Sequence, residues 1–163
     1  MDLERLYNEY FDMVYRFVLS ISGNHHIAEE VTQETFFKAL KKIDSFRGES
    51  SVSTWLCQIA RNIYYDYLKK QKRRDQLLSS ADTGMEDPGV ETRIMRKASA
   101  RELHMIIHEL REPYKEVFSL RTFGELSFKE IGEIFGKSEG WSRVTYHRAK
   151  LMIKEELENE SNV

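Results

Sequence analysis

The residues best suited to chemistry lie near the C-terminus, where cationic and aromatic side chains follow one another closely. Arg143, Tyr146, His147 and Arg148 fall within two turns of a predicted helix. Guanidinium groups donate hydrogen bonds to phosphates and to guanine edges, and rings can contact bases. This combination indicates contact with the major groove of DNA, provided that one helix presents all four side chains.

The residues before this group supply the required elements. Ser127 and Glu130 have capping-box spacing, which predicts a helix beginning there. Gly136 can take the positive φ that ends a helix, and Ser138 is a favourable N-cap for the next one. The apolar positions of the first helix recur at i, i+3 and i+4, at Ile131, Ile134 and Phe135. The segment 127–150 therefore reads as a helix-turn-helix, although two packed helices with a solvated basic face would share much of this pattern.

A second group of cations lies on a helix predicted to begin near Ser53 or Thr54 and to continue to about Arg74. These cations are Arg61, Lys69, Lys70, Lys72, Arg73 and Arg74, and Trp55, Tyr64, Tyr65 and Tyr67 interleave with them. Cations can hold phosphates while a ring stacks on an unpaired base, which contributes about 1–3 kcal/mol per base. The alternative is a solvated helix end, with Trp55 and Tyr67 in the core.

The preceding predicted helix, from about His25 to Ile43, has the opposite charge near its start. Glu29, Glu30 and Glu34 surround Gln33. Acids near a helix N-terminus are favoured by the helix dipole, which is a sufficient structural reason for them. The functional interpretation is an acidic docking face for a basic partner protein, and the spacing alone does not decide between the two.

Catalysis and metal binding find little support. The pairs His25–His26 and His104–His108 lack the cysteine or acid that would complete a metal site, so we expect no metal, no cofactor and no catalytic residue. The single cysteine, Cys57, lies in an apolar stretch and is expected to pack as a small hydrophobic residue.

Composition bounds the class of protein. The 163 residues include 25 basic and 27 acidic side chains, for a net charge of −2. The overall charge therefore does not by itself indicate a nucleic-acid-binding protein. With 40% hydrophobic residues the chain can bury cores. No apolar run approaches the roughly 20 residues of a membrane span, and the N-terminus lacks signal-peptide features, so we expect a cytoplasmic protein without direct membrane insertion.

The hydrophobic periodicity predicts an all-α protein of two small helical bundles joined by a flexible linker. Residues 1–74 form the first bundle, beginning with a long helix from Leu3 that ends at Gly23-Asn24. Residues 75–100 form the linker, which enters the next helix near Glu91. Residues 101–163 form the second bundle, in which Pro113 opens a helix from its first turn.

Several segments in both halves of the chain together form a recognisable pattern. They are residues 28–36, 43–48 and 53–62 in the first half, and residues 110–118 followed by the helix-turn-helix in the second. The first set resembles region two, and the second set region four, of the extracytoplasmic-function sigma factors of bacterial RNA polymerase. The likeness covers nearly the whole chain apart from the linker, in the family's order and with about its spacing.

The resemblance implies that the chain binds RNA polymerase core and directs it to promoter DNA. Glu30, Gln33 and Glu34 would dock on the clamp helices of the largest catalytic subunit. Arg61, Lys69, Lys70, Arg73 and Arg74 would hold phosphates at the minus-ten element, and Asn62 would help to read a base. Arg143, Tyr146, His147 and Arg148 would contact the minus-thirty-five element. The family also implies an anti-sigma factor, often membrane-bound, as a partner.

The chain departs from the family pattern at three positions. Arg111 stands where many relatives have proline, and Gln58 stands where a basic residue is common. Trp141 lies in the recognition helix, where it would either reach bases or fill the space beside Ser142, and we favour packing. These departures leave open the promoter sequence rather than the role.

Two other classes of function remain open on the residues alone. A stand-alone helix-turn-helix regulator would bind duplex DNA without polymerase. A helical adaptor would use the basic helix to dock an acidic partner protein.

Overall fold

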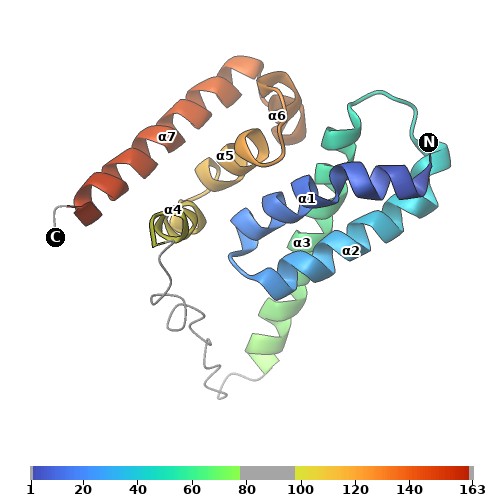
Figure 1. The fold of residues 1–163 in the computed structure, drawn as a ribbon, viewed down its shortest axis with the longest axis horizontal. Coiled ribbons are helices and arrows are strands. Elements are labelled where there is room, and N and C mark those ends of the chain that lie inside the picture. The colour runs from blue at the N-terminus through green and yellow to red at the C-terminus, as the bar shows by residue number, and fades with distance from the viewer. Residues whose placement is uncertain (1, 78–97, 162–163) are drawn as a thin grey trace.

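The computed structural model describes residues 2–77 and 98–161, and all the regular structure in these ranges is helical. The first three α-helices are α1 (Leu3–Ser22), α2 (His25–Lys42) and α3 (Val52–Leu77), with a 3-10 turn, η1 (Ile43–Ser45), before α3. The C-terminal helices are α4 (Ala98–Glu109), α5 (Tyr114–Thr122), α6 (Phe128–Phe135) and α7 (Glu139–Ser161). Figure 1 shows them as two groups, with α1–α3 on one side and α4–α7 on the other. The predicted all-α, two-bundle class is confirmed.

Local signals set the first helix ends as predicted. Gly23 ends α1 with a φ of 67°, and its N–H donates to the Leu19 carbonyl. The Asn24 side chain accepts from the Ile27 N–H at 3.0 Å and starts α2. A left-handed glycine followed by an Asn cap turns the chain within two residues, so α1 and α2 pack side by side.

Two details differ from the predictions, and a third falls where the structure is not described. Helix α3 starts at Val52, earlier than expected, because the Ser51 hydroxyl accepts from the Thr54 N–H at 3.1 Å. Pro113 is the N-cap of α5, not a residue of its first turn, and has a φ of −87°. The predicted helix start near Glu91 lies outside the described residues, and α4 is described from Ala98.

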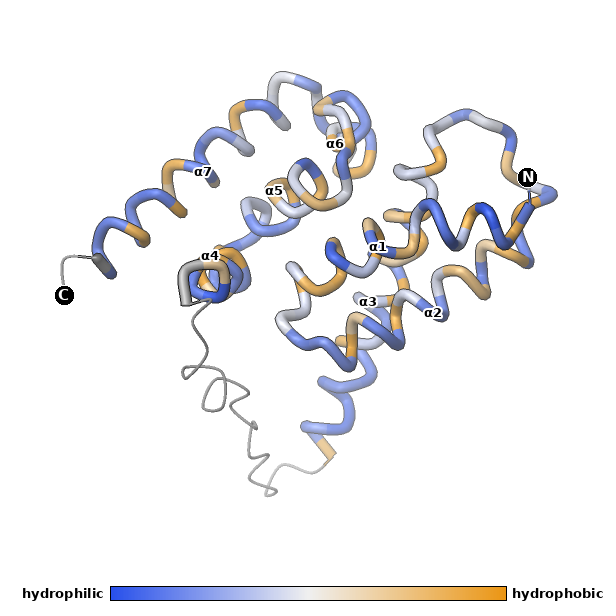
Figure 2. Tube along the Cα trace, in the orientation of Figure 1, coloured by the Kyte–Doolittle hydropathy of each residue, from blue (hydrophilic) through white to orange (hydrophobic). Residues whose placement is uncertain are grey.

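The hydrophobic core runs through both helical groups. Phe17 and Val18 of α1 and Leu56 of α3 belong to the same buried cluster as Leu120 of α5 and Ile131 of α6. A second cluster holds α4 against α7 through Ile106, Ile107, Leu110, Ala149 and Ile153. In Figure 2 hydrophobic and hydrophilic positions alternate along α1, whereas the second half of α3 is mostly hydrophilic. The two bundles are therefore packed against each other, with α1 touching both α4 and α5.

Candidate nucleic-acid interface

The predicted helix-turn-helix is formed by α6 and α7. The Ser127 hydroxyl accepts from the Glu130 N–H at 3.1 Å, and the Glu130 carboxylate accepts from the Ser127 N–H at 3.2 Å, which is the predicted capping box. Gly136 takes a φ of 66° and ends α6. The Ser138 hydroxyl accepts from the Trp141 N–H at 3.1 Å, so it caps α7 as expected. Every turn of this motif is therefore fixed by contacts within a few residues.

The turn also depends on a close approach at Gly132, inside α6. A Cβ at this position would lie 2.7 Å from the Lys137 carbonyl oxygen and 2.9 Å from that of Ser138. Both contacts are with backbone atoms, which cannot move aside without shifting the start of α7. Glycine is thus required here because a side chain would have no room, and not because of the φ angle.

We expect Gly132→Ala to destabilise the protein by about 1–3 kcal/mol, the usual range for overpacking a tight site. Urea unfolding followed by circular dichroism measures this loss. Gly140→Ala is the matched control, because a Cβ there would meet only the Ser138 hydroxyl oxygen, at 3.9 Å. Equal stability of the two variants would contradict the steric argument.

The exposed face of α7 carries three of the four side chains predicted to contact the major groove. Arg143, His147 and Arg148 are all exposed. Arg143 donates to Glu139 at 3.3 Å, one turn earlier, and both side chains remain 53% exposed. Exposed i,i+4 pairs contribute only about 0.3–0.5 kcal/mol. An anion that binds Arg143 more strongly can therefore displace Glu139 at little cost. Val144 lies on the same face and is 49% exposed. This exposure was not predicted, because nothing in the sequence around Val144 distinguishes it from a valine of the core.

The fourth predicted residue, Tyr146, has a structural duty. Its ring is partly buried and stacks on Phe118 of α5, with centroids 5.6 Å apart and planes 13° apart. It also packs against Phe128 of α6 at 5.5 Å. Tyr146 therefore joins three helices, and this packing leaves less of the ring for DNA than the sequence suggested.

Trp141 packs as favoured from the sequence. Its ring lies 5.4 Å from that of Phe135, at the end of α6. Ser142, beside it, is fully buried and donates to the Ser138 carbonyl at 3.3 Å. The Trp141 ring therefore packs against the end of α6, while Ser142 occupies a buried position next to it.

The second candidate surface is the outer face of α3. Asn62, Lys69, Lys70, Arg73 and Arg74 are exposed there, as a phosphate-binding surface requires. The aromatic residues between them are less available. Tyr64 is buried with its hydroxyl on the Ile21 carbonyl at 3.4 Å, and Trp55 is half-buried against Phe46, with ring centroids 4.7 Å apart.

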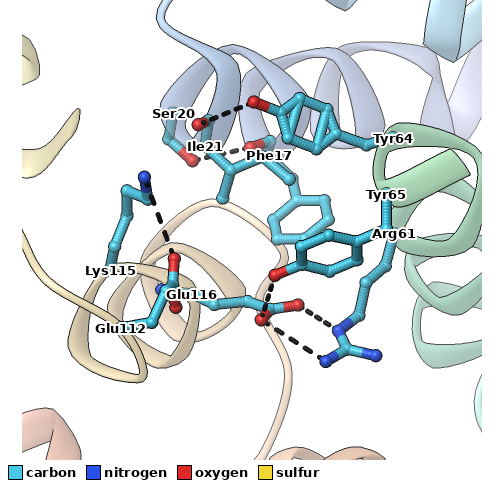
Figure 3. A network of polar contacts seen from close by, with 9 residues as sticks. All are labelled: Phe17, Ser20, Ile21, Arg61, Tyr64, Tyr65, Glu112, Lys115 and Glu116. Atoms are coloured by element: carbon cyan, nitrogen blue, oxygen red, sulfur yellow. Dashed lines mark hydrogen bonds and ion pairs between the residues drawn. The ribbon is translucent and has the colours of Figure 1, made fainter. Parts of the chain in front are cut away.

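Arg61 differs from the other cations because it faces the C-terminal bundle. Its guanidinium donates through Nε and Nη2 to the carboxylate of Glu116 on α5, and the Tyr65 hydroxyl donates to the same carboxylate at 2.8 Å (Figure 3). The Glu116 side chain is 2% exposed and that of Arg61 26%. Burial, followed by the negative charge of Glu116, raises the pKa of Tyr65 well above its usual range. Tyr65 therefore stays protonated and keeps donating to Glu116.

A second polar contact joins the bundles at the start of α3. The Glu130 carboxylate of α6 accepts from the hydroxyls of Ser51, at 2.6 Å, and Thr54. Although partial burial opposes its ionisation, hydrogen bonds from Ser51, Thr54 and Ser127 lower the pKa of Glu130. Ser51 and the start of α3 thus face α6 in this arrangement.

The predicted docking residues lie together on the outer face of α2. Glu30, Gln33 and Glu34 are exposed, with Glu30 beside His26 at 3.3 Å and Glu34 beside Lys38 at 3.7 Å. The face continues into Phe37, 58% exposed, and Leu40, 45% exposed. Neither residue was predicted to belong to this face, although the spacing of both from Gln33 and Glu34 places them on the same side of the helix. The surface is acidic at one end and apolar at the other.

Three of the histidines, His25, His104 and His108, lie near the junction between the bundles, where the His108 ring is 2.9 Å from the position that a Cβ on Gly23 would occupy. Tyr15 and His25 share a hydrogen bond at 2.8 Å, and His104 stacks on Phe123 at 5.8 Å. Among residues 2–77 and 98–161, no group of three or more His, Cys, Asp or Glu side chains is placed to hold a metal ion. No helix in the described part of the chain is long and apolar enough to cross a membrane.

An all-α pair of bundles with a helix-turn-helix in the second defines a class of DNA-binding protein, and comparison with known proteins narrows it. Residues 6–74 match the family model of sigma-70 region 2, and residues 100–153 match that of sigma-70 region 4. The chain is 32% identical to the ECF RNA polymerase sigma factor SigM of Bacillus subtilis, over 94% of each chain. It is 30% identical to the RNA polymerase sigma factor YlaC of the same organism, over 95% of this chain and 91% of the relative.

A solved structure shares the fold. The sigma factor RpoE of Bartonella quintana, in complex with the anti-sigma factor NepR, superposes with a TM-score of 0.76 at 23% identity, over 95% of this chain and 96% of that one. The chain belongs to the extracytoplasmic-function sigma factors of the sigma-70 family. It is an alternative sigma factor, which directs RNA polymerase core to promoters for transcription initiation.

Proposed function

We propose that the outer face of α2 is the polymerase-docking surface, with Glu30, Gln33 and Glu34 as its charged part. Phe37 and Leu40 extend it as apolar anchors. An exposed phenylalanine beside a cluster of acids supports this assignment, because interface cores combine apolar anchors with a polar rim. The exposed face of α2 is the observation that carries the proposal, because a stand-alone DNA-binding regulator would have no function for this face.

DNA binding is divided between the two bundles. In the N-terminal bundle, residues 1–74, the exposed Lys69, Lys70, Arg73 and Arg74 hold phosphates near the minus-ten element, together with Arg61 once it is free. Asn62, also exposed, helps to read a base there. In the C-terminal bundle, residues 101–163, α7 enters the major groove at the minus-thirty-five element. The segment between α3 and α4, within the predicted linker of residues 75–100, lets both sites bind together, so that two weak contacts become one selective one.

On α7, Arg143, His147 and Arg148 make the direct contacts, and Tyr146 holds the helix in place while its exposed edge reaches the DNA. The protein is not an enzyme itself, and works in the cytoplasm, where core polymerase and promoters meet. An anti-sigma factor is the expected inhibitor, since the sigma factor that shares this fold was solved in complex with one.

We expect Arg143→Ala to weaken minus-thirty-five binding and to reduce discrimination by about 1–3 kcal/mol if the guanidinium reads a base. Arg148→Ala would instead weaken binding to all duplexes and reduce the slope of log K against log salt by about 0.9, as for one lost phosphate contact. Fluorescence anisotropy with promoter and random duplexes separates the two. Lys154→Ala, exposed on the same helix beyond the reading face, is the control.

Run-off transcription with purified core polymerase on genomic templates tests the whole proposal. Adding the protein should create new start sites with a shared upstream sequence. Failure to associate with core at any salt concentration would exclude the proposal.

A further inference from the structure

An apolar side chain stands in the middle of the basic face of α7. Val144 is 49% exposed. Its neighbours on this face, Arg143, His147 and Arg148, are also exposed and make the proposed DNA contacts. A valine loses rotamer freedom in a helix, so alanine would favour α7 more. Neither core packing nor helix propensity therefore accounts for a valine at this position.

The backbone beside Val144 is open to a close approach. Gly140 lies one turn earlier on the same side of α7, and a Cβ there would meet only the Ser138 hydroxyl oxygen, at 3.9 Å. Because glycine adds no side chain, another molecule can come near the helix at this point. A valine side chain is short, and it reaches the edge of a base only where the helix lies close to the groove floor.

The neighbouring polar side chains lean toward α6 and not over Val144. The Arg143 guanidinium donates to Glu139 at 3.3 Å and lies over the Phe128 ring of α6, 5.3 Å from its centroid. The His147 ring lies 6.4 Å from the same ring. Both side chains are therefore held on the α6 side of α7, which leaves the methyl groups of Val144 available.

Thymine differs from the other bases in the major groove by its C5-methyl group, which an apolar side chain can contact. The other groups that bases display in that groove are hydrogen-bond donors and acceptors, and valine can pair with none of them. We propose that Val144 reads a thymine methyl group in the minus-thirty-five element, between the polar contacts of Arg143 and Arg148. The inference rests on the proposed function, since it takes α7 as the helix in the major groove. It adds a base identity to the DNA that this chain selects.

Removal of the methyl group from the DNA tests the contact directly. Core polymerase with the full-length protein first transcribes a pool of promoters with a randomised minus-thirty-five segment, and the transcripts identify the preferred sequence. Each thymidine of either strand is then replaced in turn by deoxyuridine, which lacks the C5-methyl group and keeps the same hydrogen-bonding groups. We expect one replacement to reduce transcription at limiting polymerase about fourfold, equal to about 0.8 kcal/mol, as for one apolar carbon group returned to water.

Val144→Ala supplies the other half of the test. The position is exposed, so the variant should fold as the wild type does. We expect it to transcribe the thymidine and deoxyuridine templates equally, because the side chain that contacts the methyl group is gone. Leu157→Ala is the matched control, since Leu157 is 37% exposed and lies farther along α7, on another side of the helix. This control should keep the wild-type response to deoxyuridine.

An equal response of the wild type and Val144→Ala to every deoxyuridine replacement would overturn the assignment, as would a preferred sequence without thymine in either strand. A uniform loss of transcription by Val144→Ala across the pool, without dependence on any base, would overturn it in favour of a protein contact. In each of these results the wild type still transcribes, so the proposed function stands. Absence of transcripts with the wild-type protein would contradict the proposed function and overturn the assignment with it.

Discussion

Charge reversal on α2, by Gln33→Lys together with Glu34→Lys, is expected to lower the affinity for polymerase core at least about a hundredfold. Both side chains are exposed on the docking face. The introduced lysines would meet a partner surface that has to be complementary to acids, and disrupting a desolvated charge pair costs about 2–5 kcal/mol. Fluorescence anisotropy of the labelled chain, titrated with core, measures the loss.

The matched control makes the same change in net charge elsewhere. Glu155→Lys with Asn159→Lys replaces one acid and one neutral residue on the exposed face of α7. Core affinity should remain near that of the wild type in this variant. Normal affinity in the α2 variant would refute the docking assignment, provided that circular dichroism shows both bundles folded.

Phe17→Ala is expected to cost about 3–5 kcal/mol of the free energy of unfolding. Phe17 is fully buried and belongs to the core cluster shared by α1, α3 and α5. In the view of Figure 3 its ring lies between those of Tyr64 and Tyr65. Removing it would leave a cavity lined by both bundles. Urea unfolding with an unchanged m-value measures this loss as a shift of the midpoint.

Phe37→Ala is the control for Phe17→Ala, since it removes the same side chain from a position that is 58% exposed. We expect it to cost less than about 1 kcal/mol, within the range of surface substitutions. Equal losses in the two variants would contradict the burial argument. The same Phe37 variant should weaken core binding, because an exposed ring that does little for folding is free to serve an interface.

The helix ends could be predicted because their signals are local. Gly23 with Asn24, Ser127 with Glu130, and Gly136 with Ser138 each act through contacts within four residues. Such contacts depend on spacing along the chain, which the sequence displays directly. The all-α fold class could be predicted for the same reason, because the hydrophobic periodicity of each helix is visible within that helix alone.

The contacts between the bundles could not be predicted in this way. Arg61 and Glu116 are 55 positions apart, and nothing in the sequence separates Arg61 from the exposed Lys69 or Arg73 on the same helix. The packing of Tyr146 could not be predicted for a similar reason, because its stacking partner, Phe118, comes from a different helix. Periodicity indicates which face of a helix is buried, but not which neighbour covers it.

The two contacts of the Glu130 carboxylate limit which residues can replace it. One carboxylate oxygen closes the capping box of α6, and the other accepts from Ser51 and Thr54 across the bundle junction. Selection acting on either task therefore constrains the other. Glutamine retains an acceptor but cannot offer oxygen to both sides, whereas alanine loses both contacts at once. The capping box lies wholly within the C-terminal bundle, so it does not depend on the contacts with Ser51 and Thr54.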